Sequence, residues 1–234
     1  MLRTVEKLDS SPRAGGPDDG LYMEMLDRAR ALVPKLRGCA PVTEEKRTLP
    51  PETERDLHAA GLFRILQPKR VGGCELDYVA LVDFADVVAL ADASVAWNLT
   101  NLASHHWMLG MFDRRAQDTI WNDSPDTLIA SSFIFPAGRA RRTKGGYLLS
   151  GRWPFSSGVN SSTWNMLAGV IATDDEADGV EYRVFLVKKA DYRIIDTWTA
   201  TGLRGTGSND VEIEEAFVPE HMTLAVRDVA GGPT

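Results

Sequence analysis

The sequence has few of the residues that mark secreted, metal-binding or membrane-spanning proteins. Cys39 and Cys74 are the only cysteines among 234 residues, too few for a disulfide framework and too isolated for a Cys-based metal site. We therefore expect no metal and a reducing, cytoplasmic environment. No run of about 18 apolar residues exists, which excludes a membrane-spanning helix. Residues 1–20 also lack the apolar core of a secretory signal.

Positive charge is in short supply as well. The chain has 26 Lys and Arg against 33 Asp and Glu, a net charge of −7, which disfavours sequence-independent binding to nucleic acid. The basic cluster Arg139, Arg141, Arg142 and Lys144 is short, and we interpret it as a solvated turn. Hydrophobic residues make up 44% and charged residues 25%, which are the proportions of a folded globular protein.

The pattern of apolar residues changes near Ser124, from a helical period to a strand period. We expect a flexible leader over residues 1–20, a helical domain over 21–124, a β-barrel-like domain over 125–222 and a hinge over 223–234. Runs of helices followed by runs of strands are typical of an α+β chain with segregated domains. The expected fold is thus an N-terminal all-helical domain followed by an antiparallel β domain.

The helices are predicted from apolar spacing and from their start and stop signals. A first helix should run from Leu21 to near Gly38, and a short one should follow Pro50-Pro51 and end at Gly61. Asp77 is the expected N-cap of a third helix. Asp92 or Ser94 should cap a fourth that reaches Phe112, and Arg114 to Trp121 should form a fifth.

Five segments have the composition of strands and are separated by turn formers. The turns are Lys144-Gly145-Gly146 and Asp174-Asp175-Glu176. The predicted strands are Thr127–Phe133, Tyr147–Ser150, Trp164–Ala172, Tyr182–Val187 and Val211–Val218.

The Gly-rich stretch Gly202 to Gly207 invites interpretation as a phosphate loop. Its spacing fits neither a Rossmann fingerprint nor a P-loop, and a predicted strand follows it. From the residues alone it is a tight turn in which Arg204 and Ser208 hold either the loop or a ligand.

Four histidines are present, and His105 has the most informative setting. Leu102, Leu109 and Phe112 place it on the apolar face of its helix. A buried imidazole needs a partner, and a ligand hydroxyl would serve. A structural histidine is the alternative. His106 is adjacent, but two neighbouring residues of a helix cannot ligate one metal from one face.

The segment Trp153-Pro154-Phe155-Ser156-Ser157-Gly158 places two hydroxyls between bulky aromatic residues. Small donors beside flat walls, among which we also count Trp164, suit a planar heteroaromatic ligand. The alternative is a β-bulge or hairpin whose serines bond the backbone.

Several of these motifs occur in the order found in one superfamily. The chain resembles the acyl-CoA dehydrogenase superfamily over most of residues 45–220. The matching motifs are Leu49-Pro50-Pro51, Ala60-Gly61-Leu62-Phe63, Gln67-Pro68, Gly72-Gly73, Ser131-Ser132, Pro136-Ala137-Gly138, Gly145 to Gly151, Trp153 to Gly158, Leu203 to Ser208 and Phe217-Val218-Pro219.

Two subfamilies differ at the motif beside the flavin. The dehydrogenases have Trp-Ile-Thr-Asn/Ser-Gly, whereas this chain has Phe155-Ser156-Ser157-Gly158. That version resembles the oxygenase components of two-component flavin-dependent monooxygenases, of the p-hydroxyphenylacetate hydroxylase and seco-androstadienedione hydroxylase type. His105, followed by Trp107 and Leu109, is similar to the active-site histidine of that group.

The resemblance implies a cofactor, a reaction and roles for individual residues. A separate reductase would supply reduced FMN, or less favourably FADH₂, and oxygen would form a C4a-hydroperoxide that hydroxylates an aromatic or polycyclic substrate. Ser157 and His105 would be the catalytic residues. Ser157 would bind near flavin N5, and His105 would bind the substrate hydroxyl. The remaining assigned positions are Ser156, Trp153, Phe155, Arg204 and Ser208 for the cofactor, and Ser131 and Ser132 for the substrate.

The resemblance also sets the expected assembly and the alternatives. Family members continue into a C-terminal helical bundle, absent here, and are homo-oligomers, often tetramers. One alternative is an acyl-CoA dehydrogenase with bound FAD. The other is a non-catalytic remnant that acts as an interaction module.

Overall fold

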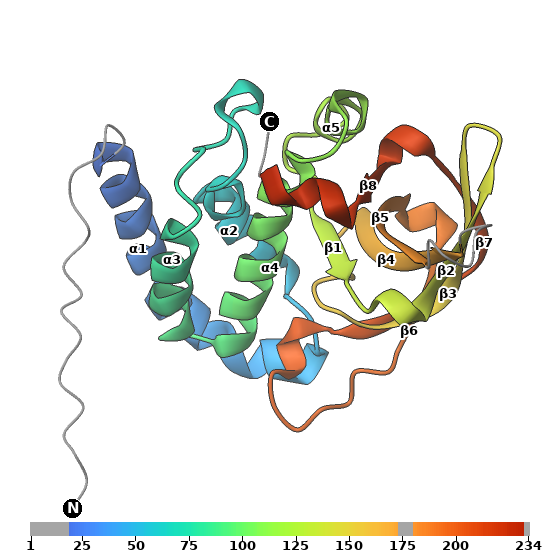
Figure 1. The fold of residues 1–234 in the computed structure, drawn as a ribbon. Helices are drawn as coiled ribbons and strands as arrows, with labels where there is room; N and C mark the ends of the chain where they lie inside the picture. The colour runs from blue at the N-terminus through green and yellow to red at the C-terminus, as the bar shows by residue number, and fades with distance from the viewer. Residues whose placement is uncertain (1–18, 173–179, 232–234) are drawn as a thin grey trace, which may run out of the picture.

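A computed structural model of the protein describes residues 19–172 and 180–231. Helices come first in the chain and strands second, and the two parts lie side by side (Figure 1). This arrangement confirms the expected α+β class. The turn predicted at Asp174-Asp175-Glu176 and most of the expected leader lie outside the described residues.

The first helix, α1 (Asp19–Lys46), is longer than predicted. It passes through Gly38 and contains Pro34 and Pro41, so the expected stop at Gly38 is wrong. Leu36 and Thr43 on either side of the glycine are both buried, at 1% and 0% exposure. Tertiary packing of this face outweighs the cost of the helix-breaking residues.

The other helices are α2 (Pro51–Ala59), α3 (Ala80–Ala89), α4 (Ala93–Leu109) and α5 (Arg114–Trp121). Asp92 caps α4 as predicted, accepting hydrogen bonds from the backbone N–H groups of Ser94 and Val95. Asp77 accepts from Val79 N–H at 2.9 Å, although α3 begins only at Ala80. Among the described residues, none of these helices is long and apolar enough to cross a membrane.

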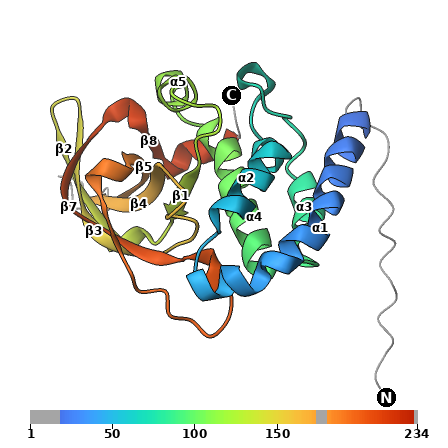
Figure 2. The same ribbon diagram turned by 180° about the vertical axis from the view of Figure 1, so that it is seen from behind.

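The β part is one eight-stranded sheet in the order β6-β7-β3-β2-β4-β5-β8, with β1 paired to β4. Most pairs are antiparallel, as expected, but β1 and β2 each run parallel to β4. Figure 2 shows from behind how the strands curl beside the helices. The strands are β1 (Ile129–Ser132), β2 (Gly138–Thr143), β3 (Gly146–Ser156), β4 (Trp164–Ala172), β5 (Val180–Lys188), β6 (Arg193–Ile195), β7 (Asn209–Pro219) and β8 (Thr223–Ala225).

Three of these strands, β2, β6 and β8, were not predicted. The cluster expected as a solvated turn is mostly strand β2, because Arg139, Arg141 and Arg142 pair with β3. Of the four basic residues, Lys144 is the one in the turn. Residues 223–225, expected in a hinge, form β8 and pair with β5. Alternation of arginine with small residues hides the strand period from a search for apolar residues.

The buried apolar side chains form two hydrophobic cores. One lies within the helical part, and the other within the sheet together with α5 and the end of α4. Helix α4 contributes to both, with Leu102 in the first and Leu109 in the second. The side chains of α4 are therefore held firmly between the two halves of the chain.

Candidate active site

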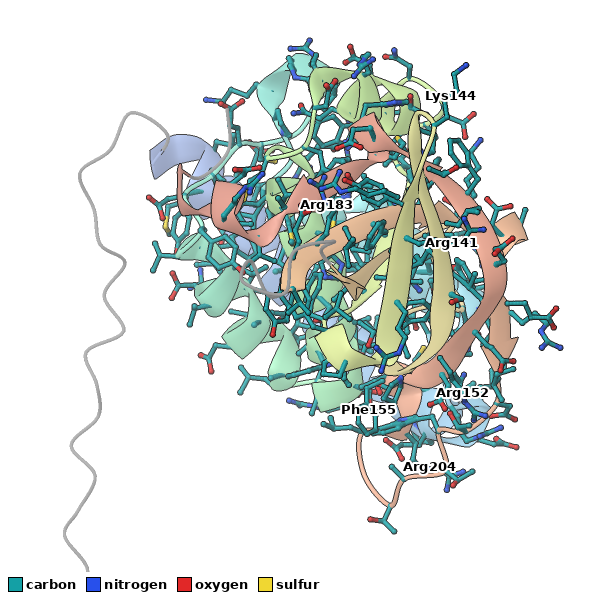
Figure 3. The ribbon with its side chains drawn as sticks, turned by 45° about the vertical axis from the view of Figure 1, so that its right-hand side comes forward. Arg141, Lys144, Arg152, Phe155, Arg183 and Arg204 are labelled. Carbon is teal, nitrogen blue, oxygen red and sulfur yellow. The ribbon has the colours of Figure 1, made fainter. Side chains whose placement is uncertain are left out.

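A pocket of about 460 Å³ opens where α4, β1, the end of β3 and the loop before β7 converge. Phe155 and Arg204 lie at this end of the sheet (Figure 3). The walls are aromatic or aliphatic side chains interrupted by hydroxyl groups. The lining residues are Trp97, Asn101, Ser131, Ser132, Phe133, Ile134, Phe155, Ser157, Trp198, Leu203, Thr206 and Ser208.

A bulge at the end of β3 decides which serine reaches the pocket. The register with β7 shifts between Trp153 and Ser156, and Phe155 has a left-handed backbone with φ of 63°. Ser157 therefore lines the pocket. Ser156 is fully buried, and its Oγ accepts a hydrogen bond from Asn165 Nδ2 at 2.9 Å. Ser156 therefore does not reach the pocket, where we predicted that it would contact the cofactor.

The aromatic residues of this segment divide in the same way. Trp153, assigned to the cofactor, is fully buried and donates from Nε1 to the carbonyl oxygen of Ala168 at 2.6 Å. Trp164 is also buried, outside the pocket wall. Phe155 is 60% exposed and meets the Trp198 ring edge-on at 6.1 Å. Of the three predicted walls, Phe155 alone lines the pocket.

A chain of hydroxyl groups runs along the pocket wall. Trp97 Nε1 donates to Ser157 Oγ at 3.0 Å, and Ser157 Oγ lies 2.7 Å from Ser208 Oγ. Ser208 Oγ lies 2.6 Å from Thr206 Oγ1, which donates to the Leu203 carbonyl at 2.9 Å. Ser208 was predicted at the site, but Trp97 and Thr206 were not.

The loop that carries Thr206 and Ser208 packs tightly on the helical part. A Cβ atom on Gly205 would lie 2.2 Å from Thr43 Cγ2 and 2.9 Å from Ser94 Cβ. Asn98 Nδ2 donates to the Gly205 carbonyl at 3.0 Å. The Gly-rich stretch is therefore a turn seated against α1 and α4, which agrees with the structural interpretation of its spacing.

Arg204 and Ser208 have different positions in this loop. Ser208 is 4% exposed and lines the pocket. Arg204 is half-buried and is not part of the wall, and its Nε atom is buried without a hydrogen-bond partner. We predicted that Arg204 and Ser208 would both contact the ligand. Only Ser208 lies on the pocket wall, where it could do so directly.

Ser131 and Ser132 both line the pocket, as predicted for substrate contacts. The Ser132 hydroxyl donates to the Pro154 carbonyl at 2.7 Å, which ties β1 to the bulge. Ser131 forms an isolated bridge with Ser157 through the backbone. The two predicted groups of serines thus share one wall.

His105 lies behind this wall instead of on it. Its Nδ1 atom donates to the Ile129 carbonyl at 2.6 Å, and its ring stands edge-on to Phe133 at 6.0 Å. The side chain is 4% exposed, and burial lowers the pKa of His105 to about 4. Because Nδ1 carries the proton of the neutral ring, Nε2 is left as an acceptor.

The chemistry of the lining is that of a site for a flat, uncharged ring system. None of the lining residues carries a charge. Within residues 19–172 and 180–231, no three His, Cys, Asp or Glu side chains are grouped so as to hold a metal. Aromatic walls with a few hydroxyls suit a heteroaromatic ring with polar atoms at one edge, and the residues present therefore fit an isoalloxazine ring.

Comparison with known proteins places the chain among flavin enzymes. No protein-family model matches it. It is 37% identical over 202 residues to the flavin-dependent monooxygenase oxygenase subunit HsaA of Rhodococcus jostii (strain RHA1), covering 86% of this chain and 52% of that relative. It is 33% identical over 214 residues to the FADH(2)-dependent resorcinol hydroxylase oxygenase component of Rhizobium sp. (strain MTP-10005), covering 91% and 52%.

Solved structures agree with this placement. The HsaA monooxygenase from M. tuberculosis has a TM-score of 0.84 at 35% identity, with 88% of this chain and 53% of that chain covered. XiaF from Streptomyces sp., in complex with FADH2 and glycerol, has a TM-score of 0.83 at 30% identity, covering 89% and 52%.

Fold and pocket together define a protein of the acyl-CoA dehydrogenase-like class. Within that class, the chain is similar over most of its own length to the oxygenase components of flavin-dependent monooxygenases. It spans about half the length of the curated relatives it matches.

Proposed function

We propose that the protein acts as the oxygenase component of a two-component monooxygenase, which hydroxylates an aromatic or polycyclic substrate with oxygen and reduced flavin from a separate reductase. The observation that carries the proposal is the uncharged aromatic pocket with the Ser157 hydroxyl on its wall. The relatives named as oxygenase components support the same conclusion. Reduced flavin supplies the activation of oxygen, which protein side chains do not provide.

The residues of the pocket have separate tasks in this proposal. Ser157 binds the ring edge of the flavin near N5, while Phe155 and Trp198 cover its surface. The lining carries no charged group that would hold water beside the flavin, and a dry site protects reactive intermediates from hydrolysis. Ser156 and Trp153 lie behind the pocket wall, bonded to Asn165 and to the Ala168 carbonyl, and are not assigned a flavin contact.

Substrate binding is assigned to the side of the pocket formed by β1. Ser131 and Ser132 lie on this wall, and His105 stands directly behind it against Phe133. With Nδ1 committed to the Ile129 carbonyl, Nε2 is the atom that would accept a hydrogen bond from a substrate hydroxyl.

The flavin tail and the assembly complete the proposal. Arg204 has an unpartnered buried Nε and is our candidate for the flavin phosphate. The resorcinol hydroxylase is FADH(2)-dependent and XiaF was solved with FADH2, which favours FADH₂ over the FMN that the family resemblance implies. A homotetramer, which the family resemblance implies, and a cytoplasmic location also belong to the proposal.

The test combines the protein with a flavin reductase, NADH and either FMN or FAD, and offers resorcinol as a phenolic probe. We expect oxygen consumption coupled to a hydroxylated product. Reduction of an electron acceptor by an acyl-CoA, without oxygen uptake, would support the dehydrogenase instead. Absence of binding to either reduced flavin would leave only the non-catalytic module.

A matched pair of variants tests the assigned serine. Ser157→Ala should divert oxygen to hydrogen peroxide, because the hydrogen bond at the flavin edge is lost, whereas Ser156→Ala should keep the wild-type ratio of product to peroxide. Equal ratios in both variants would contradict the assignment of Ser157.

A further inference from the structure

The hydroxyl chain on the pocket wall is fixed at both ends by groups that have only one hydrogen-bonding role. At one end, the indole N–H of Trp97 can only donate, and it points to Ser157 Oγ. At the other end, the Leu203 carbonyl can only accept, and Thr206 Oγ1 lies 2.9 Å from it. Between these ends, each hydroxyl has a single proton to give.

These ends leave one direction for the whole chain. Thr206 uses its proton on Leu203, so Ser208 must donate to Thr206 across their 2.6 Å contact. Ser208 then has no proton for Ser157, so Ser157 must donate to Ser208 at 2.7 Å. The reverse order would set the lone pairs of Thr206 against those of the Leu203 carbonyl, which is unfavourable at a buried site. Ser208 is 4% and Thr206 2% exposed.

The direction determines what Ser157 can offer to a ligand. Its proton is committed to Ser208, and one of its two lone pairs is taken by Trp97. One lone pair therefore remains on a hydroxyl that lines the pocket and is 9% exposed. Ser157 is an acceptor toward the pocket, and a ligand atom facing it must carry a hydrogen.

We propose that Ser208 and Thr206 are positioning residues that make the pocket select reduced over oxidised flavin, by fixing the direction of the hydroxyl chain that ends at Ser157. This inference rests on the proposed function and deepens it. Reduced flavin has an N–H group at N5, which can donate to Ser157. Oxidised flavin has only a lone pair there, which would face the lone pair of Ser157. An oxygenase that receives its flavin from a reductase gains from this choice, because spent oxidised flavin is released.

The test is the ratio of two dissociation constants, that of oxidised FMN divided by that of reduced FMN, the latter measured anaerobically. Both come from quenching of tryptophan fluorescence, so no turnover is needed. In Thr206→Val, Ser208 is free to donate to Ser157, and Ser157 can then turn its own proton into the pocket. We expect the ratio to fall by about tenfold or more, the equivalent of one hydrogen bond exchanged for one repulsive contact.

Two further variants separate direction from simple damage to the pocket. Ser208→Ala removes the acceptor of the Ser157 proton and should lower the ratio in the same way, which also covers a failure of Thr206→Val to fold. Trp97→Phe removes a donor but leaves the Leu203 end intact, so both affinities change while their ratio stays. Thr100→Val, which removes a similar side-chain bond to the Ala96 carbonyl within α4, is the matched control.

The outcomes distinguish this inference from the proposed function. If the wild-type protein binds neither form of FMN and neither form of FAD, the proposed function fails and the selection fails with it. If flavin binds but the ratio is unchanged in both Thr206→Val and Ser208→Ala, the selection by hydroxyl direction is overturned alone. A lower ratio in these two variants, with a wild-type ratio in Trp97→Phe and Thr100→Val, supports it.

Discussion

Arg47, the residue after α1, donates hydrogen bonds to both carboxylate oxygens of Asp196, at 2.8 and 2.7 Å. The two residues are 149 positions apart in the sequence. The same guanidinium donates to the Trp198 carbonyl at 3.0 Å. Trp198 belongs to the pocket wall. A single side chain of the helical part therefore fastens the loop that closes one side of the site.

Removing this clamp should loosen the loop without unfolding the protein. In Arg47→Ala, we expect faster hydrogen exchange of the backbone amides at 197–203 and little change in the midpoint of urea unfolding, because an ion pair with Asp196 67% exposed contributes little to global stability. Arg28→Ala, which breaks the exposed pair with Glu24, is the control. Unchanged exchange at 197–203 would show that Arg47 does not hold the loop.

The clamp should also survive mild acid. The Arg47 guanidinium lowers the pKa of Asp196 below its ordinary value of 3.8. A carboxylate with a lowered pKa contributes stability above its unfolded pKa, and this contribution disappears as the pH falls through the folded value. The amides at 197–203 should keep their protection at pH 5, relative to Arg47→Ala at the same pH. Equal protection in the two proteins at pH 5 would contradict the role of the ion pair.

A substitution at Gly205 should displace the loop that carries Thr206 and Ser208 to the pocket wall. A Cβ atom there would overlap Thr43 and Ser94, so Gly205→Ala must move the loop. We expect a loss of about 1–3 kcal/mol in the free energy of unfolding, as for overpacking elsewhere, together with weaker flavin binding. Gly202→Ala, where nothing lies within 4 Å of the added atom, should change neither. Similar effects of the two substitutions in urea unfolding would argue against the tight seat of Gly205.

His105 should make the stability of the protein depend on pH. Burial lowers its pKa to about 4, against 6.5 for an unperturbed histidine. Between these values the unfolded chain binds a proton that the folded chain does not, so the free energy of unfolding falls as the pH falls from 6.5 to 4. His105→Gln should reduce that slope by about one proton, or roughly 1.4 kcal/mol per pH unit. Urea unfolding at several pH values measures it, and parallel curves for both proteins throughout this range would refute the claim.

The neighbouring serines of the bulge should differ in their effects on stability. Ser156→Ala leaves Asn165 Nδ2 buried without its acceptor, which costs about 1–3 kcal/mol. Ser157→Ala removes the partner of Trp97, a residue 49% exposed that water can satisfy, so we expect a loss below about 1 kcal/mol by the same principle. Thermal or urea unfolding of both variants should show a larger loss for Ser156→Ala than for Ser157→Ala. The reverse order would contradict the assignment of Ser156 as the more buried, structural serine.

The sequence predicted the fold class well and the ends of its elements unevenly. Strand β4 has the predicted bounds, Trp164–Ala172, because its apolar run is buried on both faces. The end of α1 was missed because Gly38 and Pro41 act against a helix locally, while packing of Thr43 in the folded chain acts for it.

The site was predicted in part for a similar reason. Motifs picked out segments that the fold brings together, and Ser157, Ser208, Ser131, Ser132 and Phe155 line one pocket. Which member of a pair faces inward depends on the backbone, and no sequence period shows that Phe155 adopts a positive φ. Contacts such as Trp97 with Ser157 join residues 60 apart, and no local pattern in the sequence signals them.

The left-handed turn at Phe155 makes the length of the Trp153–Ser157 segment critical, because the turn decides which of two adjacent serines faces the pocket. A deletion of one residue there would restore plain alternation and bring the hydroxyl now bound to Asn165 to the surface of the pocket, with the other turned away. Point substitutions can change the pocket lining one side chain at a time. An insertion or deletion within these five residues would instead exchange the serine that faces the pocket in one step. Libraries that aim at new substrates should therefore vary side chains in this segment and keep its length constant.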